Sequence, residues 1–452
     1  MSTQIDTSTD GGVGSPGPYG DMTATPAGNL IAVAPSDATL NVMYFGSTGP
    51  MLATSLSPYS SWSKQIIGAD TQRNSQSLTG HPSDDGIDMI VSSPGSGPYY
   101  FGYIRSGNSW STNSNGQTGD IVQVTSDGAT TAMWMAKDTQ GRFWYIEIDG
   151  VNNPYHMGCA YYSAGWHMDA TFDNVSTAEQ NRLGVAGAII GNYLVIVYDS
   201  GSGHLSYRRQ DVSGASLPGW SAAAQVGSIS DVTTSSTLSL RASGDGTLGM
   251  LAYKGGNGIS ALSYNPSTDT WGTATVLSNA ANDKHCSLIS GASATVYAVW
   301  AQYAAANSYA LVGNVYSGGS WNGSPSTLEA SGNNIAWPTG AYLSSGTKLA
   351  LVWTQGTASP WSVEFDAVAA PAPSGGADGG TLVSNSGMVV TAQIQAPAAM
   401  VSNSSLSQLY VVLRASCKLQ SDSLLLNAES IPVATRSVVA FGVDCTVIAY
   451  PF

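Results

Sequence analysis

The chain has few charged residues, few cysteines and no long hydrophobic run, and each shortage excludes a class of protein. Asp, Glu, Lys and Arg together make up only 10% of the 452 residues, against 42% hydrophobic residues. Disordered chains combine low hydrophobicity with high charge, so this composition predicts a folded protein. Four cysteines are too few for a disulfide scaffold. No apolar run reaches the roughly 18 residues that cross a bilayer, so we expect no membrane span.

Basic residues are scarce as well. The sequence has 15 Lys and Arg residues against 29 Asp and Glu residues, which gives a net charge of −14. Nucleic acids and anionic membranes select Lys and Arg, so we expect no nucleic-acid partner. Residues 1–21 lack the basic start and the apolar core of a signal peptide. We therefore expect a protein that is cytoplasmic before release and afterwards extracellular or particle-associated.

Gly and Ser are abundant, and these poor helix formers favour strands and tight turns. In the stretch Thr237–Leu277, short segments of alternating apolar residues are separated by turns such as Ser243-Gly-Asp-Gly and Gly255-Gly-Asn-Gly. Gly, Asn and Asp supply the positive φ or the side-chain cap that such turns need. The stretch therefore predicts a four-stranded antiparallel meander, which is the size of one propeller blade.

The same unit can be laid over the chain seven times. The last apolar residue of the second strand recurs at steps of 46 to 58 residues, at Tyr44, Ile90, Ile148, Tyr198, Tyr253, Trp300 and Trp353. A Tyr that ends the third strand and a Trp that opens the fourth recur in the pairs Tyr59/Trp62, Tyr103/Trp110, Tyr162/Trp166, Tyr207/Trp220, Tyr264/Trp271 and Tyr316/Trp321. A period of this length with four strands in each repeat predicts an all-β, seven-bladed β-propeller of four-stranded antiparallel blades. We interpret the repeated Trp as a wedge between blades.

Composition divides the chain into four parts. Residues 1–28 form a polar N-terminal arm, 29–368 the propeller, 369–380 a Pro/Ala/Gly linker and 381–452 a small β domain. The seventh unit ends after its third strand, and an unpaired strand edge is a liability. We hypothesise that the arm supplies the missing outer strand and closes the ring.

The hairpin that joins the second and third strands presents aromatic or imidazole side chains in most units. Such groups stack on the apolar face of a sugar, and arginines near the third strands would donate to its hydroxyls. The predicted ligand-binding residues are Tyr99, Tyr100, Arg105, Tyr155, His156, His204, Arg208, Tyr309 and Trp361. The alternative interpretation is that these residues begin strands and pack on neighbouring blades.

No motif predicts catalysis. The repeated S-x-D-x-G-x-x-W box of sialidases is absent, because Asp138-Thr-Gln-Gly-Arg-Phe-Trp has the wrong spacing. Carboxylates such as Glu147, Asp149 and Asp169 could be glycosidase candidates, but nothing in the sequence pairs them. No G-x-S-x-G elbow, phosphate loop or C-x-x-C motif occurs. We predict no catalytic residue, no metal ligand and no cofactor.

The Tyr…Trp repeat and the Gly-rich hairpins of residues 29–368 resemble the seven-bladed β-propeller lectins of bacteria and, more distantly, the six-bladed fungal fucose lectins. The resemblance implies carbohydrate binding at several shallow loop or inter-blade sites, with glycans or a glycosylated cell surface as partners. Residues 381–452 resemble no family and are expected to serve oligomerisation or attachment, which would give a homo-oligomer or a larger assembly. Two alternatives stay open: a structural or receptor-binding component of a phage or secreted particle, and a sialidase-like glycosidase.

Overall fold

The structure is a computed structural model. It describes residues 2–8, 31–36, 39–46, 49–66, 76–81, 86–93, 97–106, 109–112, 118–121, 130–149, 155–162, 166–175, 185–201, 203–232, 238–330, 334–345, 347–356, 361–373, 380–383 and 389–392. The chain divides into two compact units: Met1–Tyr316 with Trp321–Ala372, and Ser317–Ser320 with Pro373–Phe452. Every element of the described residues is a β-strand, and none of them forms a helix that could cross a membrane.

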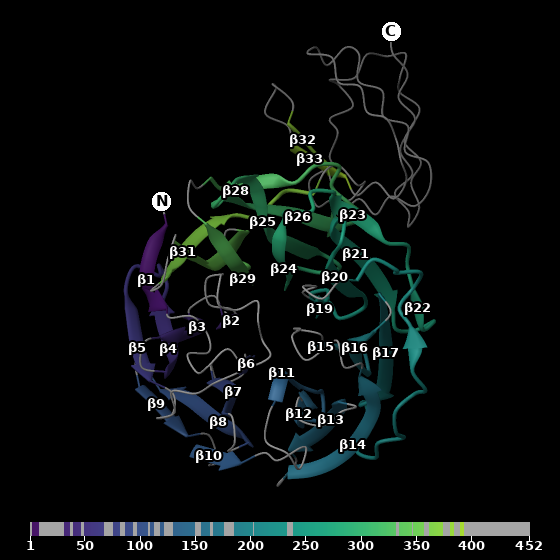
Figure 1. Ribbon diagram of the computed structural model, residues 1–452. Coiled ribbons are helices and arrows are strands. Elements are labelled where there is room, and N and C mark those ends of the chain that lie inside the picture. Colours follow the sequence, from purple (N-terminus) through teal and green to yellow (C-terminus); the bar gives the residue numbers. More distant parts are fainter. Residues whose placement is uncertain are drawn as a thin grey trace, which may run out of the picture. The chain divides into compact units, whose positions relative to one another are not determined.

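The first four sheets of the larger unit follow in chain order (Figure 1). Sheet I contains β2 (Ile31–Ser36), β3 (Thr39–Gly46), β4 (Gly49–Leu56) and β5 (Trp62–Ile66). Sheet II contains β6 (Gln76–His81), β7 (Gly86–Ser93), β8 (Gly97–Ser106), β9 (Ser109–Thr112) and β10 (Thr118–Ile121). Sheet III contains β11 (Thr130–Lys137), β12 (Phe143–Asp149), β13 (Tyr155–Tyr162) and β14 (Trp166–Val175). Sheet IV contains β15 (Val185–Ile190), β16 (Tyr193–Gly201), β17 (His204–Asp211) and β18 (Ala224–Gln225).

The remaining sheets repeat this order. Sheet V contains β19 (Leu238–Ala242), β20 (Gly249–Gly255), β21 (Gly258–Asn265), β22 (Thr270–Trp271) and β23 (Thr275–Ser278). Sheet VI contains β24 (Lys284–Ser290), β25 (Val296–Ala305), β26 (Ser308–Ser317), β27 (Ser320–Trp321) and β28 (Ser326–Glu329). Sheet VII contains β29 (Ile335–Leu343), β30 (Lys348–Gln355), β31 (Trp361–Ala369) and β1 (Thr3–Ser8). In the smaller unit β32 (Gly380–Val383) pairs with β33 (Val389–Ala392), and the other strands expected in 381–452 lie outside the described residues.

Three of these sheets depart from the expected four strands. In sheets II, V and VI, two short strands pair with different parts of the third strand, where a single outer strand was predicted. In sheet II, for example, β10 pairs with Tyr99–Phe101 of β8, and β9 pairs with Tyr103–Ser106. A short, interrupted edge presents few backbone groups in one row to another chain, which is how sheet proteins limit edge-to-edge association. In sheet IV the outer strand is only Ala224–Gln225, so Trp220 precedes it instead of opening it.

The outer strand of sheet VII comes from the other end of the larger unit. β1 pairs antiparallel with β31, from Thr3 opposite Phe365 to Ser8 opposite Trp361, with an irregularity between Gln4 and Asp6. The N-terminal strand therefore occupies the outer position of sheet VII, next to β31. Figure 1 shows β1 beside β31.

The sheets follow one another around the larger unit (Figure 1). Each first strand contacts the first strand of the next sheet: β2 contacts β6, β6 contacts β11, β11 contacts β15, β15 contacts β19, β19 contacts β24 and β24 contacts β29. The series ends where it began, because β29 contacts β2. The strands of sheets I to VI each come from one continuous stretch of the chain, so the chain moves to the next sheet only after it has completed the previous one.

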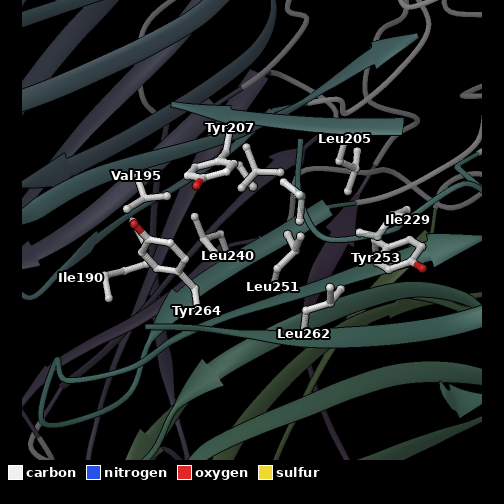
Figure 2. Packing of buried hydrophobic residues seen from close by; sticks show 14 of the residues in the cluster. Ile190, Val195, Leu205, Tyr207, Ile229, Leu240, Leu251, Tyr253, Leu262 and Tyr264 are labelled. Carbon is white, nitrogen blue, oxygen red and sulfur yellow. The ribbon is translucent and has the colours of Figure 1, made fainter. Parts of the chain in front are cut away.

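The hydrophobic core lies between neighbouring sheets. Side chains alternate along a strand, and in β25 the residues Val296, Ala298 and Trp300 belong to one cluster, whereas Tyr297, Val299 and Ala301 belong to another. The first cluster is shared with sheet V and the second with sheet VII. Figure 2 shows the equivalent cluster between sheets IV and V, where Leu205 and Tyr207 face Leu240 and Leu251. Both faces of such a strand are buried, which is why β25 has an almost continuous apolar sequence.

Several of the repeated Trp residues pack against the preceding sheet. The Trp271 ring lies 5.4 Å from Tyr207, and the Trp220 ring lies 6.4 Å from Trp144, each centroid to centroid. Across the junction between sheets I and VII, the Trp62 ring lies 5.3 Å from Phe365. These contacts agree with the interpretation of the Trp as wedges between sheets.

Candidate functional site

The nine predicted ligand-binding residues all lie in third strands. Tyr99, Tyr100 and Arg105 are in β8, Tyr155 and His156 in β13, His204 and Arg208 in β17, Tyr309 in β26 and Trp361 in β31. They come from five different sheets, and the structure does not gather them into one site. Side chains are described for His204, Arg208 and Tyr309 only; those of the other six lie outside the described part of the chain.

His204 and Arg208 both hold the chain that leaves sheet IV. The Nδ1 atom of His204 is 2.6 Å from the carbonyl oxygen of Ile229, close enough for a ring N–H to donate to it. The Nη1 atom of Arg208 donates to the carbonyl oxygen of Ser221 at 2.6 Å. The neighbouring Arg209 joins sheet IV to sheet V, since its Nε atom is 3.2 Å from the Asp269 carboxylate. At these positions the described contacts order the backbone between two sheets.

Tyr309 lies beside a second tyrosine in a hairpin. It lies directly opposite Tyr303 in the hairpin of β25 and β26, and the two ring centroids are 5.6 Å apart in an edge-to-face orientation. Tyr303 is 37% exposed, which makes it one of the three large hydrophobic side chains among the described residues that face solvent to this degree. The hairpin turns through Asn307 at a φ of 56°, a conformation that Asn tolerates better than most residues. This turn places the two rings side by side at the end of the hairpin.

A lysine and an asparagine complete the group. The Nζ atom of Lys284, at the start of β24, lies 3.9 Å from the centre of the Tyr309 ring. The same Nζ donates to the side-chain oxygen of Asn334 at 2.9 Å, and Asn334 directly precedes β29. We call Lys284, Tyr303, Tyr309 and Asn334 the Tyr309 site. It combines residues from sheet VI with the segment that enters sheet VII.

The buried carboxylate of Asp283 holds part of this site in place. Asp283 is fully buried, and its Oδ1 atom accepts a hydrogen bond from the backbone N–H of Tyr303 at 2.8 Å. Its Oδ2 atom accepts from the Ser278 hydroxyl at 2.6 Å and from the Trp300 indole at 3.1 Å. The carboxylate therefore orders Tyr303 and the start of β24, and both of its oxygens are engaged.

Burial sets the charge state of the Tyr309 site. It lowers the pKa of the Lys284 ammonium to about 8, because a partly desolvated cation is less stable than the neutral amine. Burial also raises the pKa of the Tyr309 hydroxyl, and the nearby Tyr303 and Asp283 act in the same direction. At neutral pH the site thus presents a cation beside two neutral phenol rings.

Arginines of sheets III and IV bind groups of the protein itself. Arg142 is held by Asp138 at 2.6 Å, and Arg208 and Arg209 bind protein groups as described above. The side chains of Glu147, Asp149 and Asp169 lie outside the described part of the chain. Within the described residues, no group of three His, Cys, Asp or Glu side chains could hold a metal ion.

Sequence reasoning found one member of the site and missed three. The aromatic pattern at the exit of the hairpin predicts Tyr309, whereas Tyr303 stands at the entrance of the same hairpin. The exposed end of β25, where burial stops after Ala301, is the signal for Tyr303. Lys284 and Asn334 are 50 residues apart in sequence and carry no local signal, since only the packing of β24 against β29 brings them together.

Comparison with known proteins identifies the fold and not a family. No protein-family model matches the chain, and no curated protein matches its sequence. The solved structure of the polysaccharide lyase Uly1 aligns with a TM-score of 0.51 at 10% identity, over 82% of this chain and 98% of that one. A lectin of Aleuria aurantia, described as a six-bladed β-propeller with a fucose recognition mode, aligns with a TM-score of 0.43 at 13% identity, over 68% and 96%. The NanB sialidase of Streptococcus pneumoniae, as a point mutant, aligns with a TM-score of 0.42 at 9% identity, over 75% and 68%. The larger unit is an all-β assembly of antiparallel sheets with a propeller-like fold.

Proposed function

We propose that the larger unit is a seven-bladed β-propeller that binds glycans. Seven described sheets, each linked to the next by first-strand contacts that return from β29 to β2, support the blade number. In this arrangement both faces of most strands are buried between sheets, so ligands are left with the loops and the junctions between sheets. The Tyr309 site lies at such a junction, between sheets VI and VII.

The paired rings of Tyr303 and Tyr309 carry the proposal. An exposed phenol ring offers a flat apolar surface for the C–H face of a sugar, and the edge-to-face neighbour fixes its orientation. Lys284 and Asn334 lie within reach of the same ring and supply polar groups for sugar hydroxyls. A few polar groups around an aromatic surface are what a shallow carbohydrate site requires.

Further sites are proposed at the other hairpins. Tyr99, Tyr100, Tyr155, His156 and Trp361 stand at the start of third strands, in positions equivalent to Tyr309. Several weak sites on one molecule would raise the overall avidity for a glycosylated surface without any strong single contact. We propose that such a surface, outside the cell or met by a released particle, is the partner, and that residues 381–452 provide attachment or oligomerisation.

Binding to a glycan array tests the proposal. The full-length protein should bind a subset of glycans without forming products, and Tyr309→Ala or Tyr303→Ala should weaken binding by up to about tenfold, the value of one aromatic contact. Tyr309→Phe keeps the ring and should retain binding. Thermal melting monitors the fold of each variant. Absence of binding to every glycan contradicts the proposal, and a defined multimer lost on deletion of residues 376–452 would then favour a particle component.

A further inference from the structure

Lys284 is a half-buried cation without a matching anion among the described residues. Its Nζ atom donates to the neutral amide oxygen of Asn334 and lies over the Tyr309 ring, and the described residues give it no ion pair. A Lys ammonium carries three N–H donors, and the hydrogen bond to Asn334 leaves two of them for another acceptor. By contrast, the Lys64 ammonium lies 3.1 Å from the Asp6 carboxylate.

The charged neighbours of Lys284 do not compensate it. Asp283 precedes it, but the Asp283 oxygens already accept hydrogen bonds from Ser278, Trp300 and the backbone of Tyr303. Burial lowers the pKa of Lys254 on β20, and the charge of the same Asp283 carboxylate opposes that shift. Burial, and to a smaller extent the Lys284 charge, holds the pKa of the His285 imidazole well below its usual range, so His285 is neutral. The amine thus lies beside the Tyr309 ring, the Asn334 amide and a neutral imidazole.

We propose that the Tyr309 site binds an acidic sugar whose carboxylate or sulfate pairs with the Lys284 ammonium while its ring rests on Tyr303 and Tyr309. The inference depends on the proposed glycan binding and names the substrate class. An anion at this position would satisfy the uncommitted N–H groups and would balance a partly desolvated charge. Charge-assisted hydrogen bonds of this kind are about twice as strong as neutral ones.

The proposal has a pH signature. The free Lys284 ammonium has a pKa of about 8, and a bound anion raises that pKa because it stabilises the charged form. Affinity for an acidic sugar is therefore full below pH 8 and decreases as the pH rises above it. Between pH 7 and pH 9 the decrease is about tenfold, since the protonated fraction of a group with this pKa falls by that factor. A neutral sugar shows no such decrease.

An array that presents each neutral oligosaccharide beside its uronic-acid, sialylated or sulfated form tests the inference. The full-length protein should prefer acidic members about tenfold at pH 7, and it should lose most of this preference at pH 9. Lys284→Met should abolish the preference, so that each acidic member binds no better than its neutral counterpart. The control is Lys348→Met, which removes the same charge at an exposed position at the start of β30 and should leave the preference unchanged.

The outcomes separate the two proposals. Equal binding of acidic and neutral members, or a preference that survives in Lys284→Met, overturns the acidic-sugar inference and leaves glycan binding standing. No binding to any member overturns the proposed function, and the inference with it. A preference that Lys348→Met removes as well would show that the total charge of the protein, not the Tyr309 site, selects the ligand.

Discussion

At the scale of single residues, most described carboxylates of this acidic protein have structural partners. Tyrosine hydroxyls and tryptophan indoles donate to them, in the pairs Tyr44–Asp6, Tyr253–Asp231, Tyr264–Asp269, Trp144–Asp138 and Trp300–Asp283. Aromatic side chains with a polar atom need a partner when they are buried, and a carboxylate in a turn provides one. In these five pairs the carboxylate stabilises a buried aromatic side chain.

The Tyr253–Asp231 pair predicts how the free energy of unfolding changes at alkaline pH. Burial raises the pKa of Tyr253 from 10.0 to about 12, and the Asp231 charge adds to the effect. A group whose folded pKa is raised stabilises the fold below its unfolded pKa, and this stabilisation is lost as the pH rises through the folded value. We expect the free energy of unfolding to decrease between pH 10 and pH 12, as measured by urea denaturation.

Tyr253→Phe should remove part of this pH dependence. The variant loses the 3.0 Å hydrogen bond to Asp231, so it should be less stable by about 1 kcal/mol at pH 7 and show a shallower decrease at high pH. Tyr316→Phe is the comparison, because no bond from the Tyr316 hydroxyl to a carboxylate is among the described hydrogen bonds. An unchanged slope in Tyr253→Phe would contradict the assignment.

At the scale of elements, β1 joins two sheets that are far apart in sequence. It pairs with β31 of sheet VII, while its Asp6 carboxylate accepts a hydrogen bond from Tyr44 at 2.6 Å and lies 3.1 Å from Lys64, both in sheet I. Ile5 is buried in the cluster that these two sheets share. The strand thus adds backbone pairing, apolar burial and an ion pair at the one junction where the chain does not run directly from sheet to sheet.

Removal of this strand should destabilise the protein. Deletion of residues 1–8 exposes the edge of β31 and the cluster around Ile5, so the melting temperature should fall by about 5 °C or more. Ile5→Ala should reproduce part of the loss, whereas Gln4→Ala, at an exposed position of the same strand, should not. A deletion variant with an unchanged melting temperature would mean that β1 does not hold the junction.

At the scale of the molecule, stability resides in the interfaces between sheets. Every cluster of buried residues in the described part is formed within Ile5–Ala370, and the division between the two units follows Ala372, inside the Pro/Ala/Gly segment of residues 369–380. Sheets IV, V, VI and VII each share clusters with both neighbours, so the loss of any one of them would expose two interfaces. Trp300, fully buried between sheets V and VI, is one of the largest side chains involved.

The larger unit should therefore fold without residues 374–452. A chain that ends at Pro373 keeps all these clusters and should retain the β-sheet circular dichroism spectrum and melt within a few degrees of the full-length protein. A shift in oligomeric state, measured by light scattering, would assign assembly to the removed segment. Loss of cooperative melting would show that the larger unit depends on the smaller one.

The candidate site was predictable only in part. Tyr309 could be predicted because a hairpin exit is a local pattern, readable from the glycines and aromatics around it. Lys284 and Asn334 could not, because their contact depends on the packing of β24 against β29. The predicted role of Arg208 as a sugar donor also depends on tertiary contacts, and in the structure its guanidinium donates to the Ser221 carbonyl.

The sequence by itself determined that the chain folds into antiparallel β-sheets, because alternation of apolar residues and turn-forming Gly, Asn and Asp are local properties of the chain. Tertiary structure alone decided which cations are compensated. Arg142 and Arg209 lie beside carboxylates, whereas Lys284 lies beside the Tyr309 ring and the Asn334 amide. The reason is that a charge is balanced by whatever lies within a few ångströms in space, and sheets that pack face to face bring together residues that no spacing along the chain connects.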